Sequence, residues 1–140
     1  MFLPDVNFWL ALAFASQKHH ASAKNWMQLA APRSIFFCRV TQLGFLRLAT
    51  NRKAFPLDAV PMNQSGRLYD KFSSDEQVGF AEEPDLIAGP LRTFTQLQSF
   101  SPNVWTDAYL AAFAAAADFE LVTFDKGFSQ FKNLRRTILS

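Results

Sequence analysis

The sequence has little cysteine, little net charge and no long apolar run. Its 140 residues contain one cysteine, Cys38, which excludes an internal disulfide and a cysteine-rich metal site. Because Phe36 and Phe37 precede it, we interpret Cys38 as a buried small hydrophobic residue, and a reducing, cytoplasmic setting fits. The 14 Lys and Arg nearly balance the 12 Asp and Glu, and a net charge of +2 neither requires nor excludes an anionic partner such as RNA.

An apolar run near the N-terminus, FWLALAFAS at residues 8–16, is too short to cross a bilayer, and no basic segment precedes it. We therefore expect a core helix there, and neither a signal peptide nor contact with a membrane. Repeats, linkers and low-complexity segments are absent apart from one alanine run. With 49% hydrophobic residues and 16 phenylalanines, the chain is predicted to fold as a single domain over residues 1–140.

The pattern of apolar residues predicts strands that alternate with helices. Short apolar runs that do not alternate with polar residues are typical of strands buried on both faces of a parallel sheet, so we predict an α/β fold. Expected helices cover about 6–16, 20–29, 41–48 (with Thr41 as N-cap), 61–72, a stretch that starts near Pro90 and ends at Phe100, and 103 or 106 to 118. Expected strands are the first residues up to Asp5, 35–38, 78–81, 120–124 and an edge strand at 137–139.

Three aspartates stand at the ends of predicted elements. Asp5 ends the first strand, Asp125 ends a late one, and Asp107 opens the alanine-rich helix that leads into that late strand. In a doubly wound sheet these places converge at the carboxyl edge, where ligands bind. Carboxylates brought together raise one another's pKa unless a cation neutralises them, and oxygen ligands suit Mg²⁺ or Mn²⁺. A metal-activated water could then attack a phosphodiester.

A simpler interpretation makes each aspartate a helix cap or a turn residue, since aspartate is common at helix starts. The sequence alone leaves both interpretations open, because convergence of the three side chains depends on the topology.

Five segments, taken in order, resemble the PIN-domain ribonucleases and most of all the toxin component of VapBC toxin–antitoxin pairs. They are PDVNFWLALAF at 4–14, HHASAKNW at 19–26, TQLGFLRLATN at 41–51, TDAYLAAFA at 106–114 and VTFDKGF at 122–128. The resemblance implies a three-layer α/β/α PIN-like fold with a central parallel sheet. It also implies an endoribonuclease that uses Mg²⁺, with Mn²⁺ able to substitute, and cleaves single-stranded or loop RNA. The implied partners are the RNA substrate, a small VapB-type antitoxin and a second copy in a homodimer.

By position in these motifs, Asp5, Asp107 and Asp125 correspond to metal-binding, catalytic acids of that family. Most members carry a further acid, usually Glu, in the helix after the second strand. Here that helix contains Gly44 in the same neighbourhood, so a full four-acid site is in doubt. This departure motivates one alternative, a catalytically weak or inactive PIN-like protein that binds RNA or a partner.

Four further residues are candidates for supporting roles, as substrate contacts or as neighbours of the metal ligands. Asn7 follows Asp5 and is either a contact for substrate or bound water or a turn residue, whereas Thr106 and Thr123 place hydroxyls near Asp107 and Asp125. Capping explains Thr106 nearly as well. Arg47 could contact an RNA phosphate or pair with an acid of the site.

His19 and His20 are neighbours, so on a helix they point about 100 degrees apart and cannot both face one ion. We expect structural roles for them. Base stacking is open to any exposed aromatic ring near the site, and Phe55 could belong to a groove for an antitoxin segment. A receiver-like phosphoryl-handling domain is a second alternative, disfavoured because receivers carry two adjacent early acids and Asp5 stands alone.

Overall fold

The computed structural model describes residues 1–140. Five strands form one sheet: β1 (Phe2–Pro4), β2 (Ile35–Phe37), β3 (Val78–Phe80), β4 (Glu120–Thr123) and β5 (Arg136–Ile138). The helices are α1 (Val6–Ala13), α2 (His20–Gln28), α3 (Arg39–Ala49), α4 (Met62–Ser73), α5 (Ala88–Phe94) and α6 (Val104–Ala117), with a 3-10 turn η1 (Lys126–Gln130). None of these helices has the length and apolar character that a membrane crossing needs.

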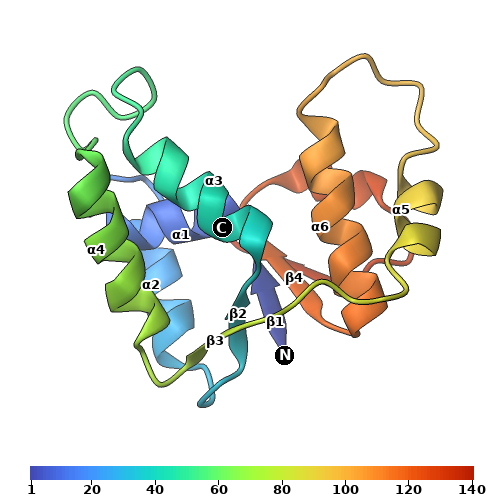
Figure 1. Cartoon of the computed structure of the whole chain (residues 1–140), viewed down its shortest axis with the longest axis horizontal. Coiled ribbons are helices and arrows are strands. Elements are labelled where there is room, and N and C mark those ends of the chain that lie inside the picture. The colour runs from blue at the N-terminus through green and yellow to red at the C-terminus, as the bar shows by residue number, and fades with distance from the viewer.

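All strand pairs are parallel, and the order across the sheet is β3-β2-β1-β4-β5. The predicted parallel sheet and the C-terminal edge strand are therefore confirmed. Helices α1 to α4 lie on one side of the sheet and α5 and α6 on the other (Figure 1). Since β1 is central and pairs with β4, the residues that follow these two strands come together at the carboxyl edge.

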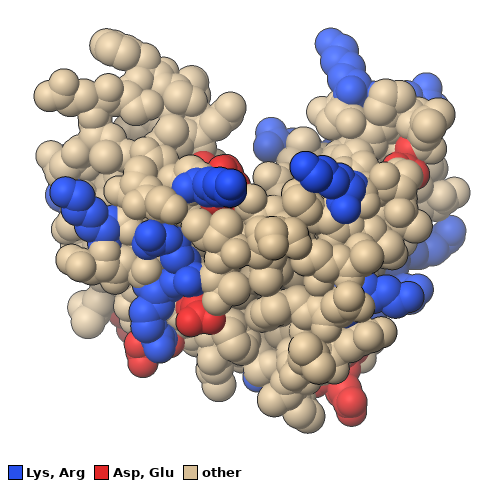
Figure 2. All heavy atoms as spheres, turned by 180° about the vertical axis from the view of Figure 1, so that it is seen from behind, with Lys and Arg blue, Asp and Glu red and all other residues tan.

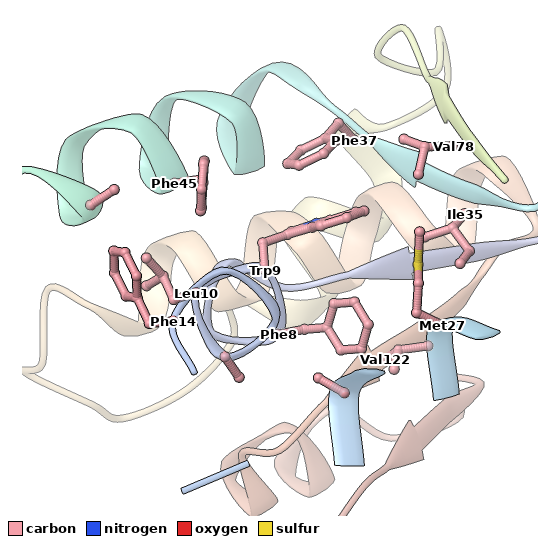
Figure 3. Packing of buried hydrophobic residues seen from close by; sticks show 13 residues of the cluster. Phe8, Trp9, Leu10, Phe14, Met27, Ile35, Phe37, Phe45, Val78 and Val122 are labelled. Carbon is pink, nitrogen blue, oxygen red and sulfur yellow. The ribbon is translucent and has the colours of Figure 1, made fainter. Parts of the chain in front are cut away.

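Side-chain alternation along the strands divides the core between the two faces. On β4, Leu121 packs with Leu3 and the α6 side chains, whereas Val122 packs on the other face with the side chains of α1, α2 and α3. On that second face Trp9 of α1 stacks on Phe37 of β2 with ring centroids 3.8 Å apart (Figure 3). The aromatic excess of the composition thus goes mainly into the core.

The alanine run of α6 allows the helix to lie close to the sheet. Its alanines at 108, 111, 112 and 114 are all buried, together with Leu110 and Phe113. The helix begins after Asn103, one of the two predicted starts, and ends at Asp118, which adopts a left-handed conformation with φ 58°. Asp118 is exposed and bonds to Arg135 at 2.9 Å, so it serves only the helix end.

The predicted N-cap of α3 was wrong. The helix begins at Arg39 with Cys38 as the N-cap, and Thr41 is the third helical residue. Its hydroxyl oxygen accepts a hydrogen bond from the Cys38 backbone N–H at 2.9 Å, reaching back over the first turn. A threonine at this position satisfies a free N–H group of the helix start as a cap would, which explains why the pattern placed the N-cap three residues too late.

The helix expected to reach Phe100 was also wrong in length, because α5 ends at Phe94. Beyond it the Thr95 hydroxyl bonds to the Leu91 carbonyl at 2.8 Å, which competes with continuation of the helix. Phe100 is fully exposed, so residues 95–103 offer no apolar face that would stabilise a longer helix against the core.

Candidate metal-dependent nuclease site

Asp5 is placed by the junction of β1 and α1. It is the residue directly after the strand and the N-cap of the helix, so the capping expectation is confirmed: its Oδ1 accepts from the Phe8 backbone N–H at 3.0 Å. Its Oδ2 accepts from the Thr123 hydroxyl at 2.6 Å. With only 5% of its surface exposed, Asp5 is a buried carboxylate held by two hydrogen bonds.

Thr123 connects two of the aspartates. It is fully buried at the end of β4, donates to Asp5 and accepts from the backbone N–H of Asp125 at 2.9 Å. Asp125 itself is exposed, and its Oδ1 accepts from the Gly127 N–H at 2.7 Å as the cap of η1. The hydroxyl therefore fixes the two neighbouring acids relative to each other across β1 and β4.

The three predicted acids line one cavity of about 560 Å³ at the carboxyl edge of the sheet. Asp107 enters it from the first turn of α6 and is half-buried. The predicted Asn7, Thr106 and Arg47 also line this cavity and are exposed, whereas Thr123 lies beneath it. Thr106 is not the helix cap, because Asn103 holds that position, so its capping interpretation was wrong.

Negative charge in the cavity is not compensated. Burial raises the pKa of Asp5 from 3.8 to about 6, against the opposing effect of its bonds from Thr123 and Phe8, with smaller contributions from the charges of Asp107 and Asp125. Burial and the charge of Asp125 also raise the pKa of Asp107 to about 6. The ion pair between Arg135 and Asp118 lies elsewhere, and no cation pairs with the three acids.

The donor set suits a hard divalent cation. All candidate ligands are carboxylate oxygens, and their shared charge is what a bound cation would offset. Their side chains do not form a closed cage, because no three acidic, histidine or cysteine side chains come close enough together to enclose an ion. An open arrangement of this kind fits Mg²⁺, which keeps several of its own waters and takes only a few carboxylates. The metal role of the three aspartates stays a prediction.

No fourth acid lines the cavity. Gly44 of α3 occupies that part of the wall, and a Cβ placed on it would lie 2.6 Å from Cγ2 of Val6. The glycine therefore permits close contact between α3 and α1, and Val6 fills the place that a side chain at 44 would need. At the position where the sequence departs from the family, the wall of the cavity therefore carries no acid.

A second cavity of about 300 Å³ adjoins the first, and Asn7 and Asp125 line both. Lys18, His19, Phe55 and Phe124 also line it. Sequence patterns did not identify this cavity, because its walls come from the α1–α2 turn, the loop after α3 and the end of β4. The sequence signals were the proximity of Phe124 to Asp125 and Phe55, which was expected only as part of a groove for an antitoxin segment. Asn103, which lines the first cavity, was likewise expected only to start a helix.

Seen from behind, the surface is notched between two lobes, and Lys and Arg side chains lie on both sides of the notch (Figure 2). Arg47 is the cation that lines the acid cavity itself, while Lys18 is exposed at the adjoining one. Such a distribution places positive charge around an acidic centre. It suits a polyanion whose reacting phosphate lies at the acids.

Comparison with known proteins agrees with this geometry. The PIN domain family matches residues 2–134. Ribonuclease VapC41 of Mycobacterium tuberculosis is 40% identical over the whole chain and 99% of its own length, and Ribonuclease VapC38 of the same organism is 31% identical over 91% of this chain and 86% of its own.

Among solved structures, VapC20 of M. tuberculosis, described as a Sarcin-Ricin loop cleaving toxin, superimposes with a TM-score of 0.68 at 16% identity. It covers 96% of this chain and 99% of its own. The VapBC2 complex of Rickettsia felis, bound to a DNA fragment from its promoter, gives a TM-score of 0.69 at 16% identity, covering 99% and 98%. These likenesses confirm the PIN-like fold, and the family match removes the receiver-like alternative. The chain therefore belongs to the PIN-domain family and, within it, to the VapC-type ribonucleases.

Proposed function

We propose that this protein is a Mg²⁺-dependent endoribonuclease, able to use Mn²⁺, that hydrolyses phosphodiester bonds in single-stranded or loop RNA. The observation that carries the proposal is the set of three carboxylates on one cavity, two of them with raised pKa values and none with a cationic partner. A cluster of this kind is costly for the folded state and is typical of a functional site.

The side chains divide the work of the reaction among them. Asp5, Asp107 and Asp125 would hold the cation, which when bound lowers the pKa of a coordinated water and offsets charge on the phosphate oxygens. Thr123 holds Asp5 in place through its hydroxyl. Arg47 on α3 and Asn7 on α1 face the cavity from one side and Thr106 from the other, where they can hold a phosphate oxygen or a water by hydrogen bonds.

The proposal extends to the cellular role. The VapC and VapBC names of its relatives and structural neighbours support a toxin that a small VapB-type antitoxin neutralises. The solved VapBC complex of Haemophilus influenzae, with a TM-score of 0.67, supports the same kind of partner. We further expect a homodimer, no association with membranes, and action in the cytoplasm.

Purified wild-type protein should cleave a single-stranded RNA in Mg²⁺ and in Mn²⁺, and EDTA should stop the cleavage. Asp107→Asn should reduce the rate at least 100-fold while the protein stays folded, because it removes one carboxylate from the cavity. Asp85→Asn, in the exposed loop before α5, removes the same charge away from the site and should cleave at the wild-type rate. An Asp107→Asn variant that cleaves as fast as wild type would overturn the assignment of the site.

A second candidate function is an RNA- or partner-binding protein that no longer cleaves. The wall formed by Gly44 and Val6 favours it, because an acid there would complete a four-acid site. Calorimetric titration with Mn²⁺ separates the two candidates. Binding that Asp5→Asn abolishes supports the nuclease, whereas absence of binding at millimolar Mn²⁺, together with retained affinity for RNA, supports the non-cleaving protein.

A further inference from the structure

The cavity beside the acids has an aromatic wall. The ring of His19 stacks on that of Phe124 with centroids 4.2 Å apart and planes within 7°, and Phe124 in turn lies parallel to buried Phe8 at 6.4 Å and 13°. His19 and Phe124 are half-buried, while Phe8 is fully buried. The result is a stack that begins in the core and ends at the surface on the His19 ring.

His19 has no evident structural role beyond this stack. It precedes α2 as the N-cap residue, but its side chain makes no capping hydrogen bond. The neighbouring His20 differs, because its Nδ1 contacts the Ala11 carbonyl oxygen at 2.8 Å and so ties α2 to α1. The structural role that was expected of both histidines is confirmed by a hydrogen-bond contact only for His20. The ring nitrogens of His19 are not used by a cap, so its imidazole is available to a ligand.

The position of the stack relates it to the acids. Phe124 directly precedes Asp125, and the cavity that His19 and Phe124 line shares Asn7 and Asp125 with the acid cavity. A chain that places a phosphate at the carboxylates can therefore extend into the second cavity without leaving the surface. The second cavity has a volume of about 300 Å³, which falls at the lower end of the range for small-molecule sites.

Charge at the same cavity favours a nucleic acid. Lys18 is exposed, precedes His19 directly and has no acidic partner. The side-chain amides of Asn7 and Gln17 on the lining can both donate and accept hydrogen bonds. Aromatic rings for stacking, one free cation for a phosphate and amides for base edges are what proteins use to bind single-stranded nucleic acid.

We propose that the cavity lined by Lys18, His19 and Phe124 is a nucleobase subsite, in which an unpaired base next to the scissile phosphate stacks on His19 while Lys18 contacts its phosphate. This inference rests on the proposed ribonuclease activity. It assigns His19 as a positioning residue for the substrate, separate from the acids. Cleavage in loops or single strands follows, because a base paired in a duplex cannot enter the cavity.

The test measures RNA binding without cleavage, in the Asp107→Asn background, using fluorescence anisotropy of a short fluorescein-labelled single-stranded RNA. His19→Ala should weaken binding about 5- to 100-fold, since loss of one base–aromatic stack has effects of this size. His19→Phe should restore most of the affinity because it keeps the stacking surface. Lys18→Gln should reduce the slope of log K against log[salt] by about 1, whereas Lys24→Gln, exposed on α2 away from both cavities, should leave it unchanged.

Abasic substitution in the RNA identifies the base. At one position of the RNA only, removal of the base should weaken binding to the Asp107→Asn protein that keeps His19. The same removal should have no effect on binding to the protein that also carries His19→Ala. If His19→Ala binds every RNA as tightly as its parent, the subsite does not exist and the cavity is free for a protein segment instead.

Parallel assays with the native Asp107 keep this outcome separate from failure of the proposed function. Wild type that cleaves RNA while His19→Ala has an unchanged KM and kcat overturns the subsite alone. Wild type that does not cleave in Mg²⁺ or Mn²⁺ overturns the nuclease, and with it this inference. Mn²⁺ should raise the Tm of His19→Ala as much as that of wild type, which shows that the acid cavity is intact in the variant.

Discussion

Replacing Asp5 by asparagine should make the metal-free protein more stable at pH 7.5. Burial raises the pKa of this carboxyl from 3.8 to about 6, and each pKa unit corresponds to about 1.4 kcal/mol. Keeping Asp5 ionised therefore costs the folded state about 3 kcal/mol. Asparagine keeps an acceptor for the Phe8 N–H but weakens the bond from Thr123, which takes back about 1 kcal/mol. The expected net gain in the free energy of unfolding is about 2 kcal/mol.

The gain should depend on pH in a defined direction. Because its pKa is raised on folding, Asp5 binds a proton in the folded protein up to about pH 6, while in the unfolded chain it loses that proton near pH 4. The contribution of Asp5 to the free energy of unfolding of the wild type is therefore fully present below pH 4 and is lost as the pH rises to about 6. The advantage of Asp5→Asn should thus be absent at pH 4, grow between pH 4 and 6, and then stay constant.

Chemical denaturation followed by circular dichroism in EDTA, at several pH values, measures this difference. Asp85→Asn is the matched control and should show no pH-dependent advantage. Addition of Mn²⁺ at about 100 times its Kd should stabilise wild type by about 2.7 kcal/mol, and Asp5→Asn should gain nothing, which reverses the order of stability. A variant less stable than wild type in EDTA at pH 7.5 would refute the reasoning that the charge of Asp5 is uncompensated.

Three other substitutions test neighbouring parts of the site. Thr123→Val removes the hydroxyl that bonds to Asp5, so it should lower the free energy of unfolding by about 1–3 kcal/mol and weaken Mn²⁺ binding. Thr123→Ser keeps the hydroxyl and should restore both the stability and the Mn²⁺ affinity. A Thr123→Val protein whose Mn²⁺ affinity is unchanged in calorimetry would argue against the bridging role. Gly44→Ala forces a Cβ against α1 and should destabilise the protein by about 1 kcal/mol in thermal unfolding. Gly66→Ala, with open space around it, should stabilise the protein by about 0.5–1 kcal/mol in the same assay. A Gly44→Ala protein more stable than wild type would show that the contact with α1 relaxes freely. Arg47→Gln should lower RNA affinity and reduce the salt slope by about 1, measured by anisotropy, and an unchanged slope would remove Arg47 from the phosphate contacts.

Much of the fold follows from the sequence because the apolar pattern is strong where elements are buried on both sides. Runs such as Ile35–Phe37 and the alanines of α6 could be assigned without a structure. Thr41 was misplaced because a threonine at the third helical position and one at the N-cap bond to the same turn. Residues 95–100 resemble a helix in composition, but the bond from the Thr95 hydroxyl to the Leu91 carbonyl and the exposure of residues 96–100 end α5 earlier.

The acids of the site were predictable, since each follows or precedes an element whose end lies at the carboxyl edge. Asp5 follows β1, Asp125 lies just past β4, and Asp107 is in the first turn of α6. The stack of His19 on Phe124 was not, because it joins residues 105 positions apart through packing that no local pattern records. The effect of Gly44 could be predicted only in part. The sequence shows that this position carries no acid, but the close contact between Gly44 and Val6 is seen only in the structure.

The most direct test of the account is a crystal of the wild-type protein soaked in millimolar Mn²⁺ and measured at a wavelength where manganese scatters anomalously. We predict an anomalous peak in the acid cavity, within coordination distance of oxygens from Asp5, Asp107 and Asp125 or of waters bound to them, and no peak there in Asp107→Asn crystals. A wild-type map without a peak at these carboxylates, or with manganese bound only elsewhere, would contradict the central claim that they form a metal-dependent nuclease site.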